Sequence, residues 1–131
     1  MLLEIYDKEY DAIPFEDLIE AAKEYGVTVE DIFEITPDSK LMNPDMYFLA
    51  WHRAHGTKTM LEVEQDKKKV LTSVKGGRVP HIDVIANYLD SKGLHHKYDK
   101  IPPATLGRFA DGRYRAMLAS ILGIKVPVIT K

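Results

Sequence analysis

Residues 43–56 read NPDMYFLAWHRAHG and carry both a start and a stop signal for a helix. Asn43 can cap the first turn, Pro44 suits the first helical position, and Gly56 suits the position just after the last turn. The apolar side chains between them point in almost every direction around the helix axis instead of forming one stripe. The sequence therefore predicts a helix at the centre of the hydrophobic core.

Three aromatic residues of this stretch allow two interpretations. Tyr47, Phe48 and Trp51 lie within five positions of one another, close to Met42 and Met46. Large aromatic side chains are usually buried in the core, and this is the default interpretation. They also dominate the energetics of protein interfaces, as flexible methionines do. Tyr47, Phe48 and Trp51 are therefore candidate protein-interface residues as well as candidate core residues.

Upstream of this stretch, two further helices are predicted. Pro14 starts the first, whose apolar residues recur every three or four positions up to Gly26. Thr28 and Asp31 have the spacing of a capping box, in which each side chain accepts a hydrogen bond from the other's backbone. This pattern predicts a short helix over residues 29–35, which Pro37 ends.

Downstream, Thr59 and Glu62 form a second capping-box pattern and start a helix whose EVEQDKKK run suits an exposed face. A turn at 75–77 marks a candidate boundary. Beyond it a helix is predicted over 80–92, followed either by one long helix up to Leu122 or, if Asp111 and Gly112 form a turn, by two short helices over 104–110 and 113–122.

The predicted fold is mainly α, a compact bundle of five to seven short helices. The terminal segments 2–6 and 125–130 look extended and are expected to pair as a small two-stranded element. Pro127 has no N–H to donate, so it is expected to keep its strand at a sheet edge.

The charges of the chain are distributed unevenly along the sequence. The net charge is −2, but residues 1–66 hold 16 acidic against five basic residues, and residues 67–131 hold four acidic against 13 basic residues. We expect an acidic helical half (residues 1–75) and a basic helical half (residues 76–131), packed as one domain. Such asymmetry indicates either that the basic part binds a polyanion or that the two parts neutralise each other.

The basic half supports a nucleic-acid hypothesis. The helices predicted over 80–92, 104–110 and 113–122 are compatible with a variant of the helix-turn-helix motif. Its candidate phosphate contacts are Lys97, Lys100, Arg108, Arg113 and Arg115. The leading prediction is a non-catalytic protein that binds DNA or RNA through these residues; the alternative is an ordinary solvated basic face.

Several other functions find little support in the sequence. The chain has no Cys, and His52 and His55, three positions apart, lack an obvious third metal ligand, so no metal or other cofactor is expected. No nucleophile or phosphate-loop motif is present, and we do not expect an enzyme. No apolar run approaches the roughly 18 residues of a membrane span, and the acidic N-terminus does not resemble a signal peptide. A cytoplasmic location is therefore expected.

The first 65 residues resemble the small tail-assembly chaperones of tailed phages. The resemblance is carried by KEYD (residues 8–11), FEDLIEAAKEYGV (15–27) and YFLAWHRAHG (47–56). It implies a non-catalytic assembly factor, in the host cytoplasm or the virion, that binds an extended protein partner through helical surfaces. Trp51 and its neighbours would then be core or contact residues. In this alternative function, the separated charges would direct head-to-tail pairing between subunits of an oligomer.

Overall fold

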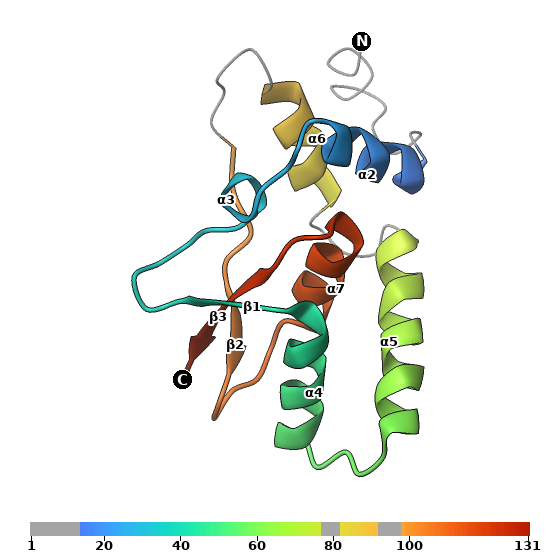
Figure 1. Ribbon diagram of the computed structural model, residues 1–131, viewed down its shortest axis with the longest axis vertical. Coiled ribbons are helices and arrows are strands. Elements are labelled where there is room, and N and C mark those ends of the chain that lie inside the picture. Colours follow the sequence, from blue (N-terminus) through green and yellow to red (C-terminus); the bar gives the residue numbers. More distant parts are fainter. Residues whose placement is uncertain (1–13, 77–81, 92–97) are drawn as a thin grey trace.

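The computed structural model describes residues 14–76, 82–91 and 98–131, which form helices around a small sheet (Figure 1). The described helices are α2 (Phe15–Glu24), α3 (Val29–Ile32), α4 (Pro44–Ala54), α5 (Met60–Lys75), α6 (Ile82–Ser91) and α7 (Arg113–Leu122). The described strands are β1 (Lys40–Met42), β2 (Ala104–Leu106) and β3 (Val126–Thr130). No helix in these three ranges is long and apolar enough to span a bilayer.

The sheet makes the fold α/β instead of purely α. The strand order is β1-β3-β2, with β3 antiparallel to β1 and parallel to β2. The prediction of an edge position for Pro127 is wrong, because β3 is the central strand. Its register explains this: Pro127 pairs with Leu41, whereas pairing with β2 begins only at Val128. The missing N–H of Pro127 is therefore tolerated on the β2 side. Residues 2–6, the predicted partner of this strand, lie outside the described ranges.

The predicted helix starts of α2, α4 and α5 are confirmed. Pro14 precedes α2, and Asn43 Oδ1 accepts a hydrogen bond from the Asp45 amide at 2.9 Å. The Thr59 hydroxyl accepts from the Glu62 amide at 3.2 Å. Side chains and a proline at these positions satisfy or remove the amide groups that a helix start leaves unpaired.

Helix α3 is shorter than the predicted 29–35 span. Its capping box forms, with the Thr28 amide donating to Asp31 Oδ2 at 2.8 Å. The chain becomes extended at Phe33, however, which forms a parallel bridge with Ile101. Two backbone hydrogen bonds hold this bridge, Glu34 N to Ile101 O at 2.8 Å and Ile101 N to Ile32 O at 2.9 Å. A contact with a distant segment therefore ends the helix before Pro37 does.

The helix predicted over residues 104–110 is wrong, and with it the helix-turn-helix arrangement. Residues 104–106 form β2, and the chain then turns back, so that Thr105 exchanges backbone hydrogen bonds with Asp111 at 2.8 and 3.1 Å. The turn contains Gly107 (φ +92°) and Gly112 (φ +140°). These dihedral angles suit glycine and interrupt a right-handed helix.

Helix α7 lies at the centre of the molecule. Helices α4 and α5 pack against it and against each other, and α2 and α6 cover one end (Figure 1). The core cluster joins side chains from both predicted halves, including Leu18 and Tyr47 with Met117 and Val128. Tyr47 and Phe48 are 0% and 1% exposed, so neither is on the surface of this chain. Their core interpretation is the one that the structure shows.

Tyr47 is expected to make stability sensitive to alkaline pH. Its hydroxyl donates to the Thr105 carbonyl at 2.9 Å. Burial raises the pKa of this hydroxyl above its usual value, the Asp111 carboxylate raises it further, and Arg115 and Arg113 lower it. The folded state therefore retains a proton that the unfolded chain loses near pH 10, and the stabilisation declines above that pH.

Tyr47→Phe provides the test of this pH dependence. We expect the free energy of unfolding from urea titrations to fall above about pH 10, by up to about 1.4 kcal/mol per pH unit for this group. The Phe variant loses about 1 kcal/mol at neutral pH but should show a shallower alkaline slope. Equal slopes for the two proteins would contradict the assignment.

Candidate functional site

The predicted phosphate-binding residues of the described ranges do not all gather on one surface. Lys100 is exposed next to Ile101, at the far end of the segment that leads to β2, whereas Arg108 is exposed in the turn beyond β2. Arg115 donates to the Pro103 carbonyl at 2.9 Å and lies 3.9 Å from the Asp111 carboxylate. Lys97 lies outside the described residues.

Charges of the two parts of the chain neutralise one another at several points. Within the described ranges, cations of residues 67–131 meet carboxylates of residues 1–66 in four ion pairs. These pairs are Lys67–Asp45 at 2.9 Å, Lys67–Glu64 at 3.7 Å, Lys75–Glu16 at 4.0 Å and Arg113–Asp66 at 2.6 Å. Part of the basic charge of residues 67–131 is therefore neutralised by acidic residues of the same chain.

Arg113 joins the start of α7 to α4 and α5. Its guanidinium group is paired with Asp66 and also lies over the Trp51 ring, 4.1 Å from the ring centroid. The Trp51 indole stacks on His55, with ring centroids 3.7 Å apart and planes at 17°. The indole N–H donates to the Ala110 carbonyl at 3.1 Å, which fixes the turn before α7 against α4.

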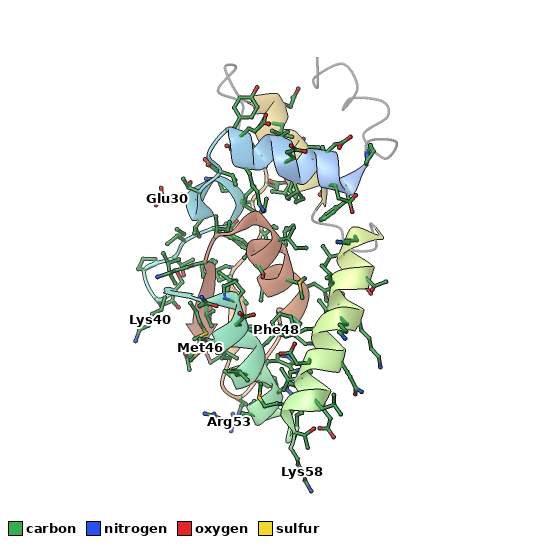
Figure 2. The ribbon with its side chains drawn as sticks, turned by 45° about the vertical axis from the view of Figure 1, so that its right-hand side comes forward. Glu30, Lys40, Met46, Phe48, Arg53 and Lys58 are labelled. Atoms are coloured by element: carbon green, nitrogen blue, oxygen red, sulfur yellow. The ribbon has the colours of Figure 1, made fainter. Side chains whose placement is uncertain are left out.

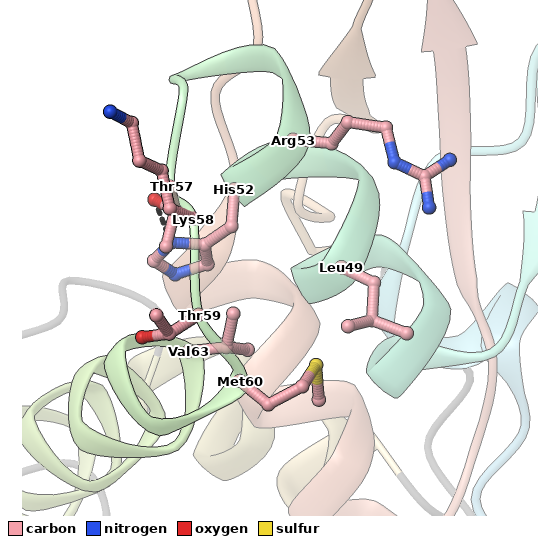
Figure 3. A pocket seen from close by; sticks show the side chains of 8 residues that line it. All are labelled: Leu49, His52, Arg53, Thr57, Lys58, Thr59, Met60 and Val63. Atoms are coloured by element: carbon pink, nitrogen blue, oxygen red, sulfur yellow. Dashed lines mark hydrogen bonds between the residues drawn. The ribbon is translucent and has the colours of Figure 1, made fainter.

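His52 continues this network and is buried. Its Nε2 lies 2.7 Å from Asp66 Oδ2, and its Nδ1 lies 2.8 Å from the Thr57 hydroxyl (Figure 3). An ionised carboxylate only accepts, so Nε2 carries the proton that is shared with Asp66. The chain Thr57–His52–Asp66–Arg113 therefore connects the α4–α5 linker, α4, α5 and α7.

His52 and His55, the two histidines in the described ranges, are held by other partners. His52 is held by Thr57 and Asp66, and His55 Nδ1 lies 2.8 Å from the Trp51 carbonyl. No group of three potential metal-binding side chains comes together in the part of the chain that the structure describes.

The turn over residues 107–112 presents an aromatic side chain to solvent. Phe109 is 69% exposed although the turn beneath it is firmly held. The Thr105 hydroxyl donates to the Phe109 carbonyl at 2.6 Å, and the Arg108 amide donates to the Lys131 carbonyl at 2.6 Å. Among the large apolar side chains of the described residues, Phe109 is the most exposed, and its turn is held in place by these hydrogen bonds.

We call Trp51, His55, Arg108, Phe109 and Arg113 the aromatic–cationic surface. One part lies at the end of α4 and the other in the turn over residues 107–112. The hydrogen bond from the Trp51 indole to the Ala110 carbonyl joins the two parts. Arg53 and Lys58 project at the same end of the molecule, below α4 and the start of α5 (Figure 2). Much of the acidic charge lies at the opposite end, where α2 exposes Glu16, Asp17, Glu20 and Glu24.

Comparisons with protein-family models, with curated proteins and with solved structures give no match to this chain. The resemblance of the first 65 residues to tail-assembly chaperones therefore stays a prediction. Function has to be argued from the chemistry of the site.

Sequence reasoning missed Phe109, His55 and Asp66 as members of this surface and its support. For Phe109 a signal was present: a lone aromatic residue in the run GRFADG (residues 107–112) sits between two glycines that favour a turn. No local pattern assigns Asp66 to Arg113, because 47 positions separate them.

Proposed function

We propose that the protein is a non-catalytic nucleic-acid-binding protein that holds single-stranded DNA or RNA on the aromatic–cationic surface. The observation that carries the proposal is the exposed Phe109 ring on a rigid turn, with Arg108 beside it. Proteins that bind single strands combine aromatic side chains, on which bases stack, with cations that follow the phosphates. Stacking is worth about 1–3 kcal/mol per base and needs no sequence preference.

Single strands suit this surface better than a duplex groove does. A helix that reads the major groove must project from the molecule. Helix α7 instead buries Ala116, Met117, Leu118, Ala119 and Leu122. The ring of Phe109, by contrast, needs an unpaired base to stack on.

The available cations set the expected salt dependence. Arg53, Lys58, Arg108 and Lys131 are exposed, and no carboxylate in the described residues forms an ion pair with them. If all four contact phosphates, the logarithm of the association constant falls with a slope of about −3 against the logarithm of salt concentration. Affinity should then drop about 50-fold between about 50 and about 200 mM salt.

Fluorescence anisotropy with labelled single-stranded DNA, single-stranded RNA and duplex oligonucleotides tests the proposal. Phe109→Ala should weaken single-strand binding by about tenfold, whereas Phe109→Trp, which preserves stacking, should retain it. Arg108→Ala should weaken binding and reduce the salt slope by about 0.7.

Lys125→Ala is the matched control for Arg108→Ala. Lys125 is also exposed but follows the opposite end of α7, so its removal should leave the affinity unchanged. Absence of binding at about 50 mM salt would overturn the proposed function. If both Phe109→Ala and Arg108→Ala left the affinity unchanged, the nucleic acid would bind at a site other than the aromatic–cationic surface.

A further inference from the structure

A groove runs between α4 and the first half of α5, separate from the aromatic–cationic surface. It consists of two adjoining hollows of about 170 and 160 Å³ that share Leu49, Met60 and Val63. In Figure 3 the side chains of these three residues point toward one another across the gap between the helices. We call these residues and the hollows between them the α4–α5 groove.

The groove is apolar along its middle and open to solvent. Met60 is 59% exposed, and Leu61 beside it is also exposed. An exposed methionine at an apolar groove is typical of surfaces that bind other proteins.

The two ends of the groove have opposite charge. At one end Asp45 and Glu64 line the hollow together with Lys67, whose ammonium group lies 2.9 Å from Asp45 and 3.7 Å from Glu64. Two carboxylates against one cation leave this end with a net charge of about −1. At the other end Arg53 and Lys58 line the hollow, and their charged groups point outward from it (Figure 3). The Glu62 carboxylate, which accepts from the Lys58 amide at 3.3 Å, reduces the charge there to about +1.

We propose that the α4–α5 groove is the interface of a homodimer, and that the exposed Met60 side chain of a second copy of this chain occupies it. A two-fold interface must be complementary to itself. An axis through the middle of the groove, near Leu49 and Met60, places the apolar centres together. It also lays the basic end of each copy over the acidic end of the other. The groove therefore meets both requirements, apolar contact at the centre and opposite charges at the rim.

This dimer goes beyond the proposed nucleic-acid binding and does not depend on it. As in the alternative function of an assembly factor, opposite charges would orient the two subunits. The dimer uses Arg53 and Lys58, which are also counted above among the cations for phosphates, but it does not use Arg108 or Phe109. Substitutions at Arg108 and Phe109 therefore test nucleic-acid binding alone.

Sedimentation velocity of the full chain from about 1 to about 200 µM measures the self-association. We expect a monomer–dimer equilibrium. Met60→Asp should weaken it at least tenfold, because it places a charge at the apolar centre. Ile35→Asp is the matched control: Ile35 is exposed between α3 and β1, away from the groove, and its substitution should have no effect.

Charge exchange identifies the geometry. Lys58→Glu and Glu64→Lys should each weaken self-association at least tenfold, since each places like charges together in a homodimer. A mixture of the two variants should form a heterodimer, because both contacts then join opposite charges. A chain that stays monomeric at about 200 µM would overturn the proposal. So would a dimer that is insensitive to Met60→Asp, or two charge variants that fail to associate with each other.

Discussion

Gly112→Ala is expected to lower the free energy of unfolding by about 4 kcal/mol. Gly112 precedes α7 with φ of +140°, where a residue with a side chain is strained. A Cβ atom at this position would lie 2.4 Å from the Ala104 Cβ and 3.1 Å from the Tyr47 hydroxyl oxygen. Ala104 and Tyr47 are both fully buried, so the neighbours cannot move aside without disturbing β2 and the core.

Gly123→Ala is the matched control for this substitution. Gly123 also has a positive φ, +74°, but no atom lies within 4 Å of the Cβ that alanine would add. Only backbone strain remains, and the expected loss is about 1 kcal/mol. Urea denaturation monitored by circular dichroism measures both. Equal losses would show that the contact of Gly112 with β2 is unimportant.

The helices were predictable because their signals are local. Pro14, Asn43 and Thr59 each mark a helix start through an interaction within four residues, and the structure has α2, α4 and α5 beginning there. The apolar positions of α2 indicated its buried face, since Phe15, Leu18, Ile19 and Ala22 repeat with helical spacing and are buried.

The sheet could not be predicted in the same way. Strands β1 and β2 have three residues each, which is too short for an alternating pattern to be recognised. Each is a strand because it pairs with β3. These pairings join residues 40–42 to residues 126–128 and residues 104–106 to residues 128–130. Pro127 argued against a central strand, and only the staggered register on the β2 side shows why it is tolerated.

The candidate site was predicted in part for a related reason. Arg108 and Arg113 were recognised as cations, but sequence alone does not say which of them is free. Arg113 contacts Trp51 and Asp66 from the other part of the chain, whereas Arg108 stays exposed. Charge counted along the chain therefore overstates the charge that a ligand meets.

Asp66→Ala is expected to lower the free energy of unfolding by about 3 kcal/mol. The Asp66 side chain is 18% exposed and accepts from both Arg113 and His52. Its removal leaves a guanidinium group and a buried imidazole without their shared acceptor. Asp66→Asn should cost less, because the amide oxygen can still accept from Arg113 while His52 changes tautomer and accepts from the amide N–H. Both variants remove the negative charge. The difference between their free energies of unfolding therefore measures the contribution of the hydrogen bonds.

Asp45→Ala supplies the matched control, because Asp45 also forms a 2.9 Å ion pair, with Lys67, but its side chain is 68% exposed. Water and salt screen this pair, so the expected loss is about 1 kcal/mol or less. Urea titrations at low and high salt separate the two cases: raising the salt should reduce the effect of Asp45→Ala and leave most of the effect of Asp66→Ala. If the two variants lost equal stability with equal salt dependence, the Thr57–His52–Asp66–Arg113 chain would not hold α4, α5 and α7 together.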